Sequence, residues 1–178
     1  ADSIRDEKVK VLKSLRRIDR SNVREKTVRG QYTAGFAQGK KVPGYLEEEG
    51  ANKTSNTETF VAIRVDIDNW RWAGVPFYLR TGKRLPTKCS EVVVYFKTPE
   101  LNLFKETWQE LPQNKLTIRL QPDEGVDIQV LNKVPGLDHK HNLQITKLDL
   151  SYSETFNQTH LADAYERVLL ETMRGIQA

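Results

Sequence analysis

Apolar residues follow a helical spacing at the two ends of the chain and a strand spacing between them. Near the start, Ser3 can cap a helix whose apolar positions are Val11, Leu12, Leu15 and Ile18. Near the end, a second helical stripe consists of Leu161, Ala164, Tyr165, Val168, Leu169 and Met173. The pattern predicts one helix at each end of the chain.

The middle of the chain alternates apolar and polar residues, which is typical of β-strands. The predicted strands are Thr27–Ala34, Val61–Ile67, Phe77–Thr81, Glu91–Lys97, Lys115–Gln121, Val126–Leu131 and Leu143–Tyr152. Clean alternation with short connections indicates antiparallel pairing. Apolar parity changes between Ile145 and Leu148, which predicts a bulge near Thr146. The predicted fold is α+β, a large and predominantly antiparallel sheet with flanking helices.

Two stretches interrupt this pattern. Residues 35–56 contain turn-forming glycines and an acidic run, so we expect a long loop there, either functional or lying over the surface. Gly30 falls inside a predicted strand and favours a bulge. A compact chain of this length buries roughly 70% of its unfolded surface, so we expect a hydrophobic core. No cap or proline follows Gly175, and we expect a fold truncated at both ends.

Composition limits the classes of protein to consider. The 178 residues carry a net charge of +4, with acids and bases interspersed, which does not favour a nucleic-acid binder. Cys89 is the single cysteine, so no intramolecular disulfide can form, as is usual in a reducing cytoplasm. The sequence contains neither a long apolar span nor the apolar region of a signal peptide, so we expect a cytoplasmic protein without a membrane partner.

The most informative run extends from Val75 to Lys88, where a strand ends and four cations fall within nine positions. Lys83 and Lys88 are five residues apart, a spacing that separates them by roughly 140° on a helix and places them on opposite faces of a strand. Only a folded-back loop, which Gly82 and Pro86 permit, brings both ammonium groups to one point. That point would suit a phosphate; the alternative, a solvated basic turn, is the more common outcome for surface lysines.

Other candidates are weaker. His139 and His141 have the spacing of a metal pair on a strand, but Asp138 falls on the other face and a surface turn is the simpler interpretation. His160 and Asp163 could form a base with its orienting acid, or a polar helix start. No nucleophile motif and no Gly-rich dinucleotide-binding turn occurs in the sequence. Trp70 and Trp72 are more typical of packing than of base stacking.

Seven short motifs, read together, resemble a known family. In order they are Arg5–Leu12, Gly30–Tyr32, Gly44–Leu46, Trp72–Phe77, Arg80–Lys83, Ile118–Pro122 and Asp163–Arg167. The chain resembles, along its full length, part of the C-terminal domain of glucose-6-phosphate dehydrogenases, most closely the bacterial ones. The resemblance implies that residues 1–178 belong to a substrate-binding and dimerisation domain.

The resemblance also implies a function. Members of the family oxidise glucose 6-phosphate to 6-phosphogluconolactone with NADP, at the entry to the pentose phosphate pathway. It assigns Lys83 and Lys88 to the substrate, chiefly its phosphate, and implies self-association through the sheet. Arg17–Ile18–Asp19 is followed by Arg20–Ser21 and does not match the family's substrate motif. No catalytic, coenzyme-binding or metal-binding residue is therefore assigned, and we expect the chain alone to be inactive.

Two further questions follow from the resemblance. Some animal members hold a second, structural NADP, which Arg80 and Arg119 would suit; however, Asp127 stands where the family has a phosphate ligand, so we expect no such site.

Two functions of other classes compete with the enzyme. A sheet that only mediates dimers would leave the Michaelis constant insensitive to Lys83, and a basic nucleic-acid module would bind oligonucleotides in a salt-dependent way.

Overall fold

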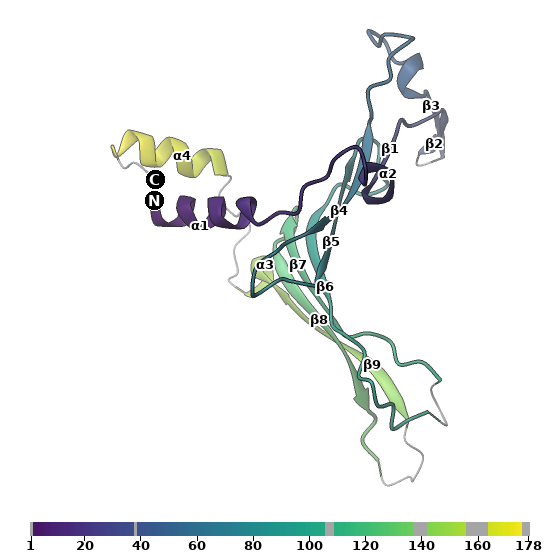
Figure 1. The fold of residues 1–178 in the computed structure, drawn as a ribbon, viewed down its shortest axis with the longest axis vertical. Helices are drawn as coiled ribbons and strands as arrows, with labels where there is room; N and C mark the ends of the chain where they lie inside the picture. Colours follow the sequence, from purple (N-terminus) through teal and green to yellow (C-terminus); the bar gives the residue numbers. More distant parts are fainter. Residues whose placement is uncertain (1, 38, 106–108, 137–141, 156–163, 176–178) are drawn as a thin grey trace. The chain divides into compact units, whose positions relative to one another are not determined.

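In the computed structural model, residues 2–37, 39–105, 109–136, 142–155 and 164–175 are described. The chain divides into two compact units, residues 1–86 and 87–178. The predicted α+β class with antiparallel sheets is confirmed, and the strands are distributed over three sheets. Figure 1 traces the elements.

The first unit is built around a three-stranded antiparallel sheet in the order β1-β4-β5. A small hairpin, β2-β3, belongs to the same unit. The elements are α1 (Asp2–Lys13), α2 (Val23–Lys26), β1 (Thr27–Gly30), β2 (Gly35–Ala37), β3 (Lys40–Val42), the 3-10 helix η1 (Tyr45–Glu47), β4 (Phe60–Asp66) and β5 (Pro76–Gly82).

The observed first helix starts earlier than predicted and also ends earlier than predicted. Helix α1 begins at Asp2, so Ser3 lies inside its first turn. It ends at Lys13, because Leu15 leaves the helix to form an antiparallel bridge with Ile67. The Arg16 backbone N–H then donates to the Asp66 carbonyl at 2.9 Å. Pairing with β4 thus overrides the helical spacing of the apolar residues.

The expected strand over Thr27–Ala34 ends at Gly30, and its pairing with β4 is continuous without a bulge. Gln31 then donates to the carbonyl oxygens of Ser55 and Thr57, and the Tyr32 N–H donates to the Thr59 hydroxyl. Part of the expected loop over residues 35–56 is ordered as β2, β3 and η1. The chain therefore leaves the sheet after Gly30.

The second unit contains a four-stranded antiparallel sheet, in the order β6-β7-β8-β9, with two helices after it. Its elements are β6 (Ser90–Tyr95), β7 (Lys115–Gln121), β8 (Gly125–Lys133), β9 (Leu143–Ser151), α3 (Tyr152–Thr155) and α4 (Ala164–Met173). The bulge predicted near Thr146 is wrong, because β9 pairs with β8 without interruption. The irregularity in this sheet lies between Ser90 and Glu91.

The register separates the two faces of this sheet. Val92, Ile118, Val126 and Leu150 are cross-strand neighbours, and so are Val94, Leu116, Ile128 and Leu148; these residues make one apolar face. The opposite face is charged and polar, and its members include Arg119, Asp127, Lys147 and Asp149. Leu148 is 60% exposed, so the apolar face is open in this chain.

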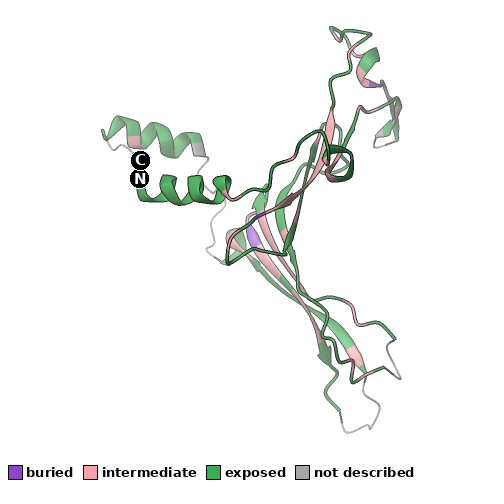
Figure 2. Ribbon diagram, in the orientation of Figure 1, coloured by how far each residue is buried: buried purple, intermediate pink, exposed green. Residues whose placement is uncertain are grey.

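The expected hydrophobic core is largely absent. Among the described residues, Ile67 is the only buried apolar side chain. Along the three-stranded and four-stranded sheets the side chains are intermediate or exposed, as Figure 2 shows. A sheet face becomes buried only when another layer packs on it, and the strand residues of these sheets stay largely accessible. The stability of this chain within its own bounds therefore rests mainly on strand pairing and local contacts.

Candidate functional site

The turn after β5 carries the first predicted binding residue, Lys83. The β4–β5 ladder ends with Phe60 opposite Gly82, and the Lys83 N–H then donates to the Thr59 carbonyl at 2.8 Å. A Cβ added at Gly82 would lie 2.9 Å from the Phe60 ring and 3.2 Å from the Thr59 carbonyl oxygen. Glycine is needed here because the strands approach closely, and this fixes where Lys83 emerges from the sheet.

Lys83 and Lys88 are both exposed. Neither ammonium group has an ion pair or hydrogen bond with another residue in the part of the chain that is described. Both are therefore available to an anion. Lys83 belongs to the first unit and Lys88 to the second, so the convergence of the two ammonium groups stays a prediction.

Arg84, the residue after Lys83, has a set of contacts that the sequence did not reveal. Its guanidinium is ion-paired with Glu48 and lies 5.4 Å from the centre of the Tyr32 ring. The Tyr32 hydroxyl donates to the same Glu48 carboxylate at 3.1 Å. Hydrogen bonding to Tyr32 and to Glu48 raises the pKa of Arg84 above its usual value. Glu48 and Tyr32 lie within segments noted for their glycines and acids, but only the fold pairs them.

A second charged cluster lies on the polar face of the four-stranded sheet. Arg119 donates to Asp149 at 2.9 Å and is ion-paired with Asp127 at 3.7 Å. Lys147 is ion-paired with Asp127 at 3.3 Å and with Asp149 at 3.2 Å. The hydrogen bond from Lys147 is the main cause of a lowered pKa at Asp149. Arg119, which would suit a phosphate of a second NADP, is thus engaged by two carboxylates.

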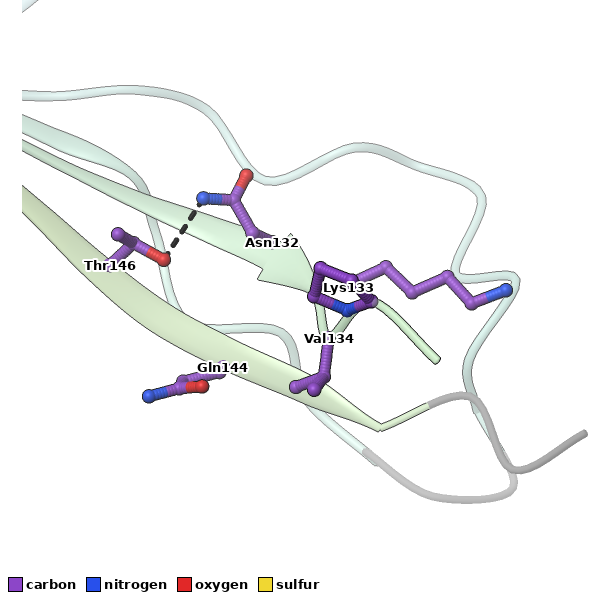
Figure 3. Close-up of a pocket in the computed structure, with 6 residues that line it drawn as sticks. Asn132, Lys133, Val134, Gln144 and Thr146 are labelled. Carbon is purple, nitrogen blue, oxygen red and sulfur yellow. Dashed lines mark hydrogen bonds between the residues drawn. The ribbon is translucent and has the colours of Figure 1, made fainter. Parts of the chain in front are cut away.

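A cavity of about 350 Å³ lies at the far end of the β8–β9 pair. It is lined by Asn132, Lys133, Val134, Pro135, Gln144 and Thr146, and Asn132 donates to Thr146 at 3.0 Å beside it (Figure 3). Neither Lys83 nor Lys88 lines it. The cavity is open and formed by neutral side chains apart from Lys133, so it has no built anion site.

The remaining candidates have different outcomes. His139, His141 and Asp138, and likewise His160 and Asp163, lie outside the described residues. Within the described ranges there is no cluster of three or more potential metal ligands, and no helix long and apolar enough to cross a membrane. Trp72 packs edge-on against Phe77 with ring centres 5.4 Å apart, whereas Trp70 is fully exposed.

Comparisons with known proteins give one consistent result. The chain is 86% identical over 177 residues to the glucose-6-phosphate 1-dehydrogenase of Dickeya dadantii, covering 99% of this chain and 36% of that protein. It is 55% identical over 177 residues to the corresponding protein of Buchnera aphidicola subsp. Schizaphis graminum, with the same coverage of 99% and 36%.

The fold gives the same result. A solved glucose-6-phosphate dehydrogenase in complex with its substrate glucose-6-phosphate matches with a TM-score of 0.80 and 37% identity, over 96% of this chain and 33% of that one. The chain thus spans about a third of the length of these relatives. All of residues 1–178 match the family described as "Glucose-6-phosphate dehydrogenase, C-terminal domain". The chain therefore belongs to the family of glucose-6-phosphate dehydrogenase C-terminal domains.

Proposed function

We propose that the chain is the C-terminal part of a longer, cytoplasmic glucose-6-phosphate dehydrogenase, called the full-length enzyme below. This enzyme oxidises glucose 6-phosphate to 6-phosphogluconolactone with NADP, at the entry to the pentose phosphate pathway. The observation that carries the proposal is the 86% identity to the Dickeya dadantii dehydrogenase along 99% of the chain. The 37% identical structure in complex with glucose-6-phosphate supports the choice of substrate.

Within the full-length enzyme, residues 1–178 act as part of the substrate-binding and dimerisation domain. Lys83 and Lys88 bind the substrate phosphate through their exposed ammonium groups, which no described residue neutralises. A hydrogen bond to a charged group contributes about 1.5–3 kcal/mol. The phosphate is remote from the carbon that is oxidised, so these lysines chiefly hold the sugar in place. The catalytic base and the NADP-binding fold come from outside this chain.

The test is steady-state kinetics of full-length Lys83→Ala and Lys88→Ala variants. Each should raise the KM for glucose 6-phosphate about 10- to 100-fold, the equivalent of one charged hydrogen bond, while kcat changes only a few-fold. Lys13→Ala, at the end of α1, serves as the matched control and should leave KM unchanged. Two unchanged KM values for the lysine variants would refute the binding role. NADPH production by residues 1–178 alone would refute the proposal that the catalytic base and the NADP-binding fold come from outside this chain.

Self-association through the β6–β9 sheet is the second part of the proposal. Its support is a face of cross-strand apolar neighbours that is open in this chain. Leu148 and Tyr95 lie on opposite faces and are 60% and 63% exposed. Light scattering of Leu148→Glu and Tyr95→Glu full-length variants should show a smaller oligomer for one of them, which locates the contacting face. An unchanged mass for both would contradict contact through the sheet.

A further inference from the structure

Lys83 and Arg84 are neighbours in sequence, yet their side chains have different surroundings. Lys83 is exposed, and its ammonium group has no partner among the described residues. Arg84 is ion-paired with Glu48 and stacked near the Tyr32 ring, so its charge is already compensated. Of these two cations, only the lysine is free to receive an anion.

Glu48 and Tyr32 are themselves fixed by backbone contacts. The Tyr45 N–H donates to the Tyr32 carbonyl at 3.0 Å, which ties the start of η1 to the segment after β1. The Glu48 N–H donates to the Tyr45 carbonyl at 3.3 Å. A Cβ at buried Gly44 would lie 2.9 Å from the Ala34 backbone nitrogen, so these two segments are in close contact. The partners of Arg84 thus sit on an ordered support.

The backbone of Arg84 indicates that this arrangement shapes the turn. Arg84 has a φ of 54°, and it is the one described residue other than glycine with a positive φ. L-residues other than glycine seldom adopt this region, and such conformations persist where the surroundings over-determine them. The anchored guanidinium supplies that constraint from one side. The Lys83 N–H bond to Thr59 supplies it from the other.

We propose that Arg84, Glu48 and Tyr32 form a clasp that positions Lys83 for the substrate phosphate. Arg84 is then a positioning residue, and it does not itself bind the phosphate. This inference rests on the proposed function, because it assigns a role relative to the sugar phosphate. The clasp holds the turn on its support, so that Lys83 is presented without having to order the loop when the substrate binds.

The direction in which Glu48→Gln changes the KM distinguishes the clasp from a direct contact between Arg84 and the phosphate. Glu48→Gln in the full-length enzyme removes a negative charge near the turn and weakens the hold on Arg84, because a neutral amide replaces the ion-paired carboxylate. If Arg84 binds the phosphate, or if only the local charge matters, the KM for glucose 6-phosphate falls. If the clasp positions Lys83, the KM rises, by roughly fivefold to twentyfold, because part of one charged hydrogen bond is lost. A KM that falls or stays unchanged overturns the proposal.

A double-mutant cycle with Lys83 provides the second measurement. Arg84→Met should raise the KM in the wild-type background and change it less than about twofold in the Lys83→Ala background, because the clasp acts through Lys83. An equal increase in both backgrounds would make Arg84 an independent ligand and overturn the clasp. Failure of the proposed function appears separately, as a Lys83→Ala variant whose own KM is unchanged.

Two more variants guard against loss of folding. Tyr32→Phe keeps the ring and removes only the hydroxyl that donates to Glu48, so it should raise KM in the same direction as Glu48→Gln with kcat and Tm nearly unchanged. Arg16→Met removes a 2.8 Å ion pair with Asp68 in the same unit. Asp68 is the only ion-pair partner of Arg16 among the described residues, so this variant should leave KM unchanged. If Arg16→Met raises KM as much as Arg84→Met, the effect is general destabilisation and the clasp is refuted.

Discussion

The backbone N–H of Lys83 donates a 2.8 Å hydrogen bond to the carbonyl oxygen of Thr59. Thr59 also donates its own N–H to the Gly30 carbonyl at 2.9 Å, and its hydroxyl accepts from the Tyr32 N–H at 2.9 Å. One threonine therefore joins the end of β1, the segment that follows it and the turn that carries Lys83. The candidate phosphate site depends on this junction as well as on its lysines.

Replacing Thr59 by valine should destabilise the full-length enzyme. The substitution keeps the shape of the side chain but leaves the part-buried Tyr32 N–H without its acceptor. An unsatisfied donor of this kind costs about 1–3 kcal/mol. Urea unfolding measures the loss. Thr81→Val is the matched control, since Thr81 is an exposed residue of β5, and it should cost much less. Equal losses would contradict the junction.

Gly82→Ala should impair substrate binding more than catalysis. The new methyl group would lie 2.9 Å from the Phe60 ring and 3.2 Å from the Thr59 carbonyl, so the turn must shift and carry Lys83 with it. We expect the KM for glucose 6-phosphate to rise roughly tenfold, similar to the loss of a weak charged hydrogen bond, with kcat nearly unchanged. Gly30→Ala, where a Cβ meets nothing within 4 Å, is the control. Similar KM values for both variants would contradict the steric argument.

Acid should destabilise the pairing of Lys26 with Asp66. The two side chains are 14% and 19% exposed and joined at 2.8 Å, and this hydrogen bond lowers the pKa of Asp66. A carboxyl whose folded pKa is depressed contributes stability above its unfolded pKa of about 3.9, and that contribution is lost as pH falls through the folded value. Unfolding free energies measured from pH 7 to pH 3 should therefore fall towards the acid end.

Lys26→Met isolates this contribution. The variant should be less stable than the wild type at pH 7, and the difference should shrink below about pH 3.9, where Asp66 of the unfolded chain takes up a proton before that of the folded chain. Lys8→Met, at an exposed position of α1, should give a pH profile parallel to that of the wild type. If the difference in unfolding free energy between Lys26→Met and the wild type stays constant down to pH 3, the ion pair does not contribute to the loss of stability in acid.

Gly125→Ala should destabilise the four-stranded sheet. Gly125 is buried, and an added Cβ would collide with the Arg119 guanidinium and lie 2.5 Å from the Leu150 carbonyl oxygen. Overpacking of this kind costs about 1–3 kcal/mol. Gly136→Ala has open space around it and should be nearly neutral. Thermal unfolding distinguishes them, and a Gly125→Ala variant as stable as Gly136→Ala would contradict the close packing of Arg119 and Leu150 around Gly125.

The alternation of apolar and polar residues predicted the strands well because each strand carries the signal in its own residues. Lys115–Gln121 was predicted to the residue, and Val126–Leu131 is the centre of the longer β8. The end of α1 was missed, because Leu15 pairs with Ile67, a partner far along the chain. The parity change in β9 leaves its pairing regular, so a change of apolar face is not by itself a bulge.

The candidate site was predictable in part. The sequence identified Gly82 as the hinge at the end of a strand, and the structure explains this glycine by the closeness of Phe60. Phosphate binding by Lys83 and Lys88, which the resemblance implies, stays a prediction. The contacts of Arg84 were not predictable, because Glu48 and Tyr32 lie in segments whose partners only the fold brings together. The hydrophobic core was expected from chain length alone, which assumes a compact chain, whereas among the described residues only Ile67 is a buried apolar side chain.

Because Lys83 and Arg84 have different surroundings, the order of these two adjacent residues matters for the structure of the turn. A protein with these residues exchanged would have the same composition, mass and isoelectric point. The guanidinium would then lie at position 83, which has no ion-pair partner among the described residues. The ammonium group, which cannot make the planar two-pronged contacts of a guanidinium, would face Glu48 and the Tyr32 ring. A sequence search that scores lysine and arginine as equivalent at these two positions would overlook the exchange. It would therefore miss the loss of the contacts that Arg84 makes with Glu48 and Tyr32.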